Sequence, residues 1–208
     1  MKSTKFLAVL AITALVFTSC KDEKKEKEVE VETTENTTKY VVKPEATTVS
    51  WEAYKTTDKV PVKGSFTALK FNAKEGATPE EALNNLDFMI PISSLSTKDE
   101  ARDATLKTAF FGALLSSEIL KGTLKYADDK YFATITMNEI TADIPLDVTF
   151  TDERRVKMKG QIQLGDWNAL GALEALNKVC FDLHKGPDGV SKTWEDVAIE
   201  ISIYLRDK

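Results

Sequence analysis

Apolar and polar residues alternate at every second position along most of the chain after residue 48. The strictest runs cover 86–92, 144–150, 156–164 and 197–205. In the first of these, Leu86, Phe88 and Ile90 are separated by single intervening residues. Because a strand turns successive side chains to opposite faces, this period predicts strands with one buried face.

Weaker alternation predicts further strands, with turn residues between several of them. We expect these strands over 49–55, 62–71, 119–126 and 131–140. Residues suited to tight turns mark reversals at 127–129, 151–153 and 186–189. About eight strands joined by hairpins favour an all-β fold, an antiparallel up-and-down β-barrel, since closure leaves no edge strand to aggregate.

Two segments interrupt the alternation and predict helical insertions. In Ser96–Glu100 a hydroxyl is followed three residues later by an acid, which approximates a capping box before a helical segment over Ala101–Leu115. Asp166 suits the N-cap of a second helix that reaches Lys178. Four apolar residues of this second segment fall on one stripe: Trp167, Leu170, Leu173 and Leu176.

The N-terminus has the order of a bacterial export signal. Two lysines precede an apolar run over residues 6–17, and Thr18 and Ser19 then lead to Cys20. The run has twelve residues, whereas a membrane-spanning helix needs about 20, so we expect a removable signal. Residues 17–20 resemble the lipobox of bacterial lipoproteins, which implies cleavage before Cys20 and a lipid anchor on it. The alternative is an ordinary signal peptide with an incidental cysteine.

The segment after Cys20 is rich in charged residues and then in threonine, with few large apolar side chains up to residue 48. Such a composition buries too little apolar surface to fold and predicts a flexible tether. The alternative for residues 24–32 is a short Lys/Glu helix. We therefore expect a lipoprotein signal peptide over 1–19, a lipidated cysteine with its tether over 20–48, and one domain over 49–208.

Lys21, Asp22 and Glu23 directly follow the proposed lipid anchor. They resemble the export tag of surface lipoproteins in the Bacteroidota. The resemblance implies a location in the cell envelope, with the lipid on Cys20 in the outer membrane and the domain on its periplasmic face or at the cell surface.

The charge of the chain disfavours a polyanionic partner. The sequence has 28 Lys and Arg against 33 Asp and Glu; removal of a signal with two lysines and no acid leaves 26 against 33, or −7. Proteins that bind nucleic acid usually carry a basic patch, and here the basic pairs stand beside acids. We expect no nucleic-acid partner, and the sequence leaves the oligomeric state open.

The residues needed for common catalytic or metal centres are scarce. His184 is the only histidine, so a Ser-His-Asp or Cys-His relay would have to use it, and we expect no enzyme. On a strand, Cys180, Asp182 and His184 would share one face and could hold a metal, but a closed zinc site has four ligands. A strand that exposes Asp182 and His184 to solvent would explain the same three residues without a metal. We expect no cofactor, no metal and no disulfide, with Cys180 as a small buried hydrophobe.

The order of the segments resembles the YceI-like family of exported bacterial proteins. The similar stretches are Val49–Lys55, Val62–Phe66, Ile92–Leu95, Arg102–Lys107, Phe110–Phe111 and, more loosely, Met137–Leu146. This resemblance implies a lipocalin-like barrel that binds polyisoprenoid or other lipid chains. The chain departs from the family at Leu164–Trp167 and in the helix that follows, which would cap or reshape the mouth of the barrel.

We therefore expect the partner of the domain to be an apolar lipid or isoprenoid chain. Six aromatic residues are candidates for lining its cavity: Trp51, Phe66, Phe88, Phe110, Phe111 and Tyr131. The same residues would also serve a solid core, because an eight-stranded barrel either fills with side chains or holds one small ligand. The alternative is thus a filled barrel that acts through its outer surface in interaction or stress protection.

Overall fold

The computed structural model describes residues 39–72, 74–152 and 154–207. The predictions for the signal peptide, for Cys20 and for most of the tether lie outside these residues.

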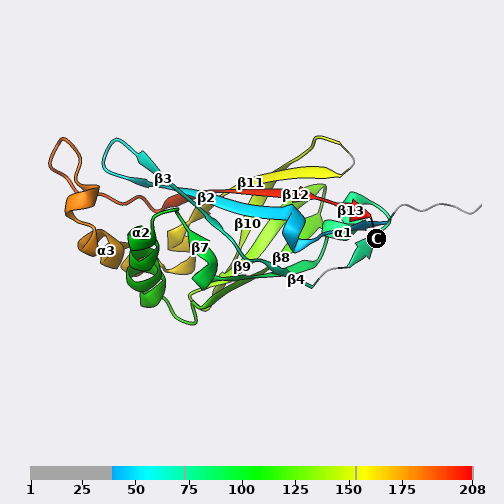
Figure 1. The fold of residues 1–208 in the computed structure, drawn as a ribbon, viewed down its shortest axis with the longest axis horizontal. Coiled ribbons are helices and arrows are strands. Elements are labelled where there is room, and N and C mark those ends of the chain that lie inside the picture. The colour runs from blue at the N-terminus through cyan, green and yellow to red at the C-terminus, as the bar shows by residue number, and fades with distance from the viewer. Residues whose placement is uncertain (1–38, 73, 153, 208) are drawn as a thin grey trace, which may run out of the picture. The chain divides into compact units, whose positions relative to one another are not determined.

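One large antiparallel sheet makes up most of the domain (Figure 1). Its strands stand in the order β4-β6-β8-β9-β10-β11-β12-β2-β3-β7. Their bounds along the chain are β2 Thr47–Lys55, β3 Val60–Phe66, β4 Lys70–Phe71, β6 Leu86–Pro91, β7 Leu95–Ser96, β8 Ile119–Ala127, β9 Lys130–Met137, β10 Ile140–Phe150, β11 Arg155–Gln163 and β12 Asp196–Tyr204.

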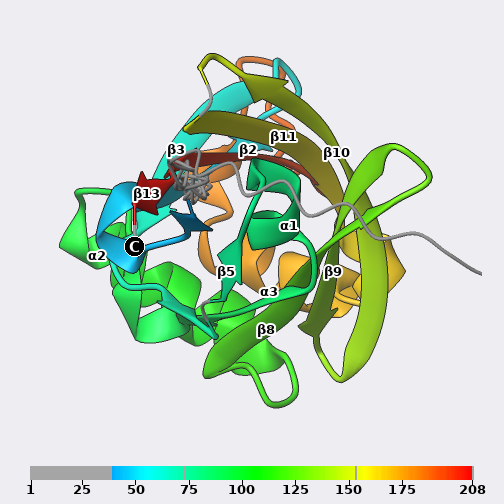
Figure 2. The same ribbon diagram turned by 90° about the vertical axis from the view of Figure 1, so that its right-hand side faces the viewer.

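The sheet curls so that its two ends meet. β6 pairs with β8, and after the 3-10 turn η2 (Ile92–Ser94) the chain enters β7, which pairs with β3. Only two residue pairs, Ser65 with Ser96 and Phe66 with Leu95, make this last ladder. Figure 2 looks along the curled sheet. The predicted antiparallel, lipocalin-like up-and-down barrel with helical insertions is confirmed.

Period-two burial is clear in β6, β10 and β11, whereas most residues of β2 and β12 are half-buried. In β6, Leu86, Phe88 and Ile90 are buried while Asp87 and Met89 are exposed. The reason is the pleat, which turns alternate side chains toward the barrel interior. The predicted turn at 127–129 is also present, since Asp128 and Asp129 have φ of 51° and 59°.

The strand predicted over 131–140 ends earlier than expected and the strand predicted over 144–150 begins earlier, with a tight turn between them. β9 ends at Met137 and β10 begins at Ile140. Asn138 and Glu139 have φ of 52° and 62°, the left-handed conformation of both central residues in a tight hairpin turn. Glu139 is not a typical residue for this turn, so the turn was not predicted from the sequence.

One end of the barrel is filled with side chains. A short helix, α1 (Pro79–Leu83), places Ala82 and Leu83 in the core, both with no exposed surface. A second sheet packs at this end in the order β13-β1-β5, formed by β1 (Tyr40–Val41), β5 (Glu75–Gly76) and β13 (Arg206–Asp207).

The domain therefore begins before the predicted boundary at residue 49. Tyr40, Val41 and Val42 are buried, and a 3-10 turn, η1 (Pro44–Ala46), leads from them into β2. The tether prediction was too long at this end because β1 gains its partners from residues 75–76 and 206–207, far away in the sequence. A local composition cannot reveal such pairing.

The two helical insertions lie together at the other end of the barrel (Figure 1). The first is α2 (Glu100–Thr105), continued by a π-helical turn η3 (Leu106–Phe110) and a 3-10 turn η4 (Phe111–Ala113). Its N-cap is Asp99, whose carboxylate accepts a hydrogen bond from the Arg102 backbone N–H. The predicted capping box assigns that role to a hydroxyl before it, Ser96 or Thr97.

The second insertion, α3 (Leu170–Val179), begins later than predicted. Asp166 lies in a 3-10 turn, η5 (Leu164–Trp167), and Asn168 then takes a left-handed conformation with φ of 51°. This break shifts the helix relative to the predicted stripe. As a result Trp167 and Leu176 are buried, whereas Leu170 is 47% exposed.

We predict that Val42→Asp lowers the free energy of unfolding by more than about 3 kcal/mol, because it moves an unpaired carboxylate into the core. Glu45→Ala, at an exposed position in η1, should change it by less than about 0.5 kcal/mol. Urea denaturation measures both. An unaffected Val42→Asp variant would show that the domain starts after this segment.

Candidate functional site

An apolar cavity of about 140 Å³ lies inside the barrel beneath the two helical insertions. Strands β2, β3 and β12 supply one side of its wall, and η3 and α3 supply the other. We call it the inner cavity. Its lining consists of Val49, Trp51, Ala53, Phe66, Leu95, Leu106, Phe110, Phe111, Leu120, Met137, Ile162, Leu164, Leu173, Leu176, Thr193, Trp194, Val197 and Ile199.

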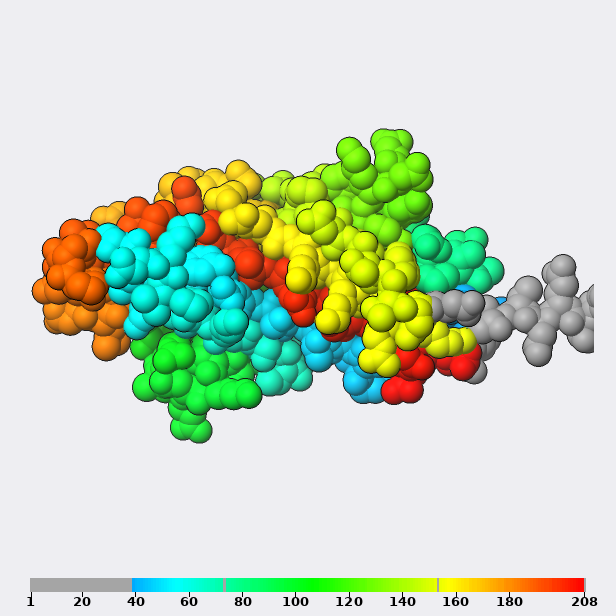
Figure 3. Space-filling model, turned by 90° about the horizontal axis from the view of Figure 1, so that it is seen from above, coloured from blue at the N-terminus to red at the C-terminus, as the bar shows by residue number. Residues whose placement is uncertain are grey.

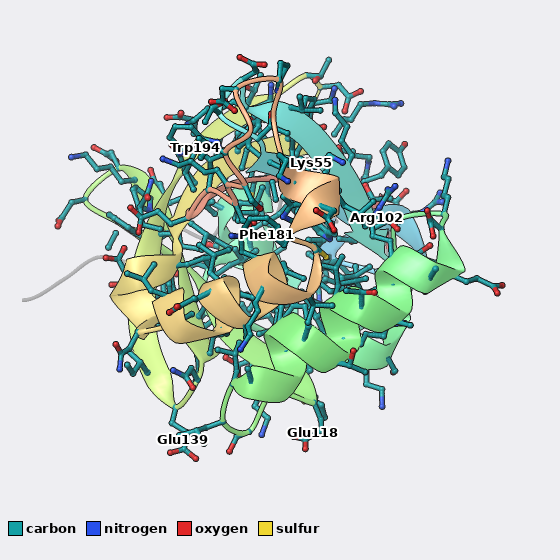
Figure 4. All side chains as sticks on the ribbon, turned by 90° about the vertical axis from the view of Figure 1, so that its left-hand side faces the viewer. Lys55, Arg102, Glu118, Glu139, Phe181 and Trp194 are labelled. Atoms are coloured by element: carbon teal, nitrogen blue, oxygen red, sulfur yellow. The ribbon has the colours of Figure 1, made fainter. Side chains whose placement is uncertain are left out.

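A larger hollow of about 290 Å³, the outer cleft, adjoins the inner cavity. Both are bordered by Trp51, Ala53, Leu106, Leu176 and Thr193, so the two hollows are neighbours that share part of their walls. The outer cleft also has polar and charged lining residues, among them Lys55, Asp99, Arg102 and His184. Figure 4 views the domain from this end.

Four of the six predicted aromatic residues meet at the inner cavity: Trp51, Phe66, Phe110 and Phe111. Phe110 and Phe111 pack edge to face, with ring centroids 5.0 Å apart. The π-helical turn η3 explains how neighbours in sequence share this site, because its wider turn brings Leu106, Phe110 and Phe111 to the same side.

Phe88 and Tyr131 lie elsewhere, which corrects this part of the predicted site. Phe88 packs against Gly122 within the core, where an added Cβ would come within 2.4 Å of the ring. Tyr131 stacks with Tyr126 near the filled end, at a centroid distance of 4.7 Å. Its buried hydroxyl has no hydrogen-bond partner among the described residues, and burial raises its pKa. Period two shows that a side chain points inward, but not at which depth.

Several lining residues were not singled out from the sequence. Leu106 stands four positions before Phe110, a helical spacing that would have found it. Val197 and Ile199 follow the same inward period as Val49 and Trp51. Trp194 lies before β12 and belongs to no periodic run, so no sequence signal pointed to it.

Trp51 stands where the inner cavity and the outer cleft meet. It pairs across the sheet with Gly64 on β3, and its indole covers that glycine: a Cβ there would lie 2.2 Å from Cζ2 of the ring. The lack of a side chain at Gly64 thus sets the position of the indole. The buried Nε1–H of Trp51 has no acceptor among the described residues.

The single histidine is held in the wall of the outer cleft. Thr193 Oγ1 donates to Asn177 Oδ1 at 2.8 Å and lies 2.7 Å from His184 Nδ1. Since the threonine hydroxyl has one proton, His184 Nδ1 is the donor in the second contact. Burial lowers the pKa of His184, and the positive charge of Lys55 lowers it further.

The predicted shared face of Cys180, Asp182 and His184 is absent because these residues are not on a strand. Cys180 caps α3, and Asp182 and His184 belong to the 3-10 turn η6 (Asp182–His184). The Asp182 side chain is 91% exposed. The described residues contain no cluster of three or more potential metal ligands. Cys180 is free and buried, and burial raises the pKa of its thiol.

The segments around the rim come from distant parts of the sequence. The loop after η6 lies beside the β2–β3 hairpin, as Figure 3 shows for the orange and cyan surfaces. Thr57 Oγ1 donates to Asp188 at 2.7 Å, and Lys55 Nζ donates to the Leu183 carbonyl at 3.1 Å. These contacts hold η6 and the loop after it against the β2–β3 hairpin.

A lipocalin-like barrel, filled at one end and hollow at the other beneath helical insertions, is the class of protein that this geometry defines. The YceI-like domain model matches residues 40–205, and the chain therefore belongs to the YceI-like family. The match begins at Tyr40, where β1 begins. No curated protein sequence matches the chain.

Two solved structures resemble the chain. The first is a polyisoprenoid-binding domain from Saccharophagus degradans implicated in plant cell wall breakdown, with 13% identity and a TM-score of 0.60 over 81% of this chain and 98% of that one. The second is BcnA of Burkholderia cenocepacia, with 16% identity and a TM-score of 0.51 over 79% and 99%. At these identities the likeness shows a shared fold.

We predict that Gly64→Ala lowers the free energy of unfolding by about 1–3 kcal/mol, because the new Cβ must displace the Trp51 indole from a packed position. Gly171→Ala is the control: it lies in α3 with no atom within 4 Å of the new Cβ and should be neutral or raise stability by up to about 1 kcal/mol. Urea denaturation reads both. Equal changes in the free energy of unfolding for the two variants would mean that the Trp51 indole can move aside at no cost.

We predict that the His184 ring titrates below 6.5, its ordinary pKa, in the folded chain, and that Lys55→Met raises this pKa. The unfolded chain then takes up the proton first as pH falls. The contribution to stability is therefore full above pH 6.5 and is lost as pH falls through the lowered pKa. Nuclear magnetic resonance of the single histidine measures the titration. A pKa at or above 6.5 would contradict the burial of the ring.

Proposed function

We propose that this chain binds a long apolar lipid of the polyisoprenoid type, with the lipid tail in the inner cavity. The observation that carries the proposal is the hollow half of the barrel: the opposite half is filled by side chains, yet here Trp51, Phe66 and Phe111 border open apolar space. The polyisoprenoid-binding domain of Saccharophagus degradans has a similar fold, which supports the same class of ligand.

The apolar lining favours a long chain. Each buried methylene contributes about 0.8 kcal/mol, whereas association costs about 4–15 kcal/mol in lost freedom. A short tail in the inner cavity therefore binds weakly. A longer tail that continues along the outer cleft gains enough buried surface to bind well, and the outer cleft adjoins the inner cavity at the walls that the two share.

The proposed role is binding and involves no catalysis. The hydrogen-bond partner of the His184 ring at the rim is the hydroxyl of Thr193, and not a carboxylate of the kind that orients the histidine of a catalytic triad. Cys180 is buried and its raised pKa keeps the thiol protonated, whereas a reactive cysteine needs a thiolate.

We also propose that the domain is held at a membrane by lipid on Cys20, after removal of residues 1–19. The support is the sequence pattern before that cysteine. Within the described residues, no helix combines the length and the apolar character that a bilayer span requires. The proposed location is the outer membrane, with the domain on its periplasmic face or at the cell surface.

We predict that farnesol, an isoprenoid alcohol with a fifteen-carbon chain, binds the chain and changes its tryptophan fluorescence, since Trp51 and Trp194 line the inner cavity. Ala53→Phe fills the junction between cavity and cleft and should weaken binding at least about tenfold. Thr48→Phe places the same ring at an exposed position of β2 and should not.

Thermal denaturation of both variants confirms that each remains folded. Two results would show that the inner cavity is not the lipid-binding site. In one, farnesol does not change the tryptophan fluorescence of the folded wild-type chain; in the other, Ala53→Phe binds farnesol as tightly as the wild type does. The filled-barrel alternative, in which the outer surface acts, would then be preferred.

We predict that Cys20→Ser leaves the domain folded but moves the chain from the membrane fraction to the soluble fraction. Stable anchoring takes about two acyl signals, and lipoprotein processing would place them on this residue. Fractionation of cells, followed by immunodetection, measures the shift. Retention of the variant in the membrane fraction would contradict the lipid anchor.

A further inference from the structure

Lys55 occupies a position where the barrel pattern expects an apolar side chain. Val49, Trp51 and Ala53 precede it on β2 at intervals of two, and all three line the inner cavity. Lys55 is the next residue on that face and lines the outer cleft. A cation thus stands at the point where the apolar path opens to the rim.

Lys55 differs from the two neighbouring lysines of the β2–β3 hairpin. Lys59 pairs with Asp196 at 2.9 Å, and Lys63 pairs with Glu52 at 2.8 Å. Among the described residues Lys55 has no carboxylate within ion-pair distance, and its Nζ donates to the carbonyl oxygen of Leu183. A carbonyl satisfies one of the three ammonium hydrogens and leaves the charge without a counter-ion.

The other charges of the outer cleft do not neutralise Lys55. Arg102 lies 3.4 Å from Asp99, and both border the cleft, so these two charges offset one another. His184 is kept neutral near pH 7 by its burial and by Lys55 itself. The remaining charge in the cleft is the single positive charge of Lys55.

We infer that the outer cleft binds the anionic head of the lipid, a carboxylate or a phosphate, against Lys55 Nζ, while the tail passes Trp51 into the inner cavity. This inference rests on the proposed lipid-binding function and adds the chemical class of the head. An oxyanion supplies the missing counter-charge, and the low polarity of the surrounding wall strengthens the attraction. Hydrogen bonds between charged groups are also stronger than neutral ones.

The test compares three ligands with one isoprenoid chain and different heads: farnesol, farnesoate and farnesyl phosphate. The protein is the full chain with Cys20→Ser, and tryptophan fluorescence reports binding. We expect the two anions to bind at least about tenfold more tightly than farnesol at low salt. Added salt should reduce this preference, because ions screen a partly exposed charge.

Lys55→Met should remove the preference for the two anions over farnesol. Lys157→Met, at an exposed position of β11, is the matched control and should keep the preference. Lys55→Arg should also keep it, because the charge remains. A preference for only one of the two anions would identify the head as a carboxylate or as a phosphate, and both results support the inference.

The single histidine gives an independent readout. A bound anion offsets the charge of Lys55, so farnesyl phosphate should raise the pKa of His184 in the wild-type chain. Farnesol brings no charge and should not raise it.

The outcomes separate the two proposals. If all three ligands bind with equal affinity, or if Lys55→Met keeps the preference for anions, the inference about the head is overturned and lipid binding stands. If the folded chain binds none of the three, the proposed lipid-binding function fails.

Discussion

The width of the barrel interior is the constraint on which the rest of the structure depends. A barrel of about eight strands encloses just enough space for side chains to fill it or for one small ligand to enter. At the end near α1, residues such as Leu83 and Met158 fill that space and are fully buried. At the opposite end, Ala53 and Gly64 are small, Trp51 covers the glycine, and open volume remains beneath η3 and α3. The question of a filled or a hollow barrel thus has a different answer at each end.

Most of the barrel could be predicted from the sequence because its strands obey a local rule. The pleat imposes period two on β6, β10, β11 and β12 whatever their partners are. What the sequence did not reveal depends on contacts between distant segments. β1 exists because residues 75–76 and 206–207 pair with it. The late start of α3 depends on the left-handed conformation of Asn168. The spacing of apolar residues along the segment does not predict that conformation.

The candidate site was predictable in composition but not in place. Phe66 and Phe88 follow the same inward pattern, yet only Phe66 reaches the inner cavity, because depth along the barrel axis is set by the register of the whole sheet. The adjacent aromatic pair Phe110 and Phe111 was recognised through the family resemblance, and the π-helical turn explains why both face the cavity. Lys55 follows three apolar residues that point inward. Among the described residues, its neighbours Lys59 and Lys63 form ion pairs and Lys55 does not, a difference that only the structure reveals.

Native mass spectrometry of the chain, purified gently from cells that produce it, tests the central claim most directly. The account predicts a non-covalent adduct with the mass of an isoprenoid or similarly long lipid, released from the chain on collisional activation. A folded chain that carries no such adduct, and that takes up none from added lipid, would contradict the claim that the hollow half of the barrel is a ligand site.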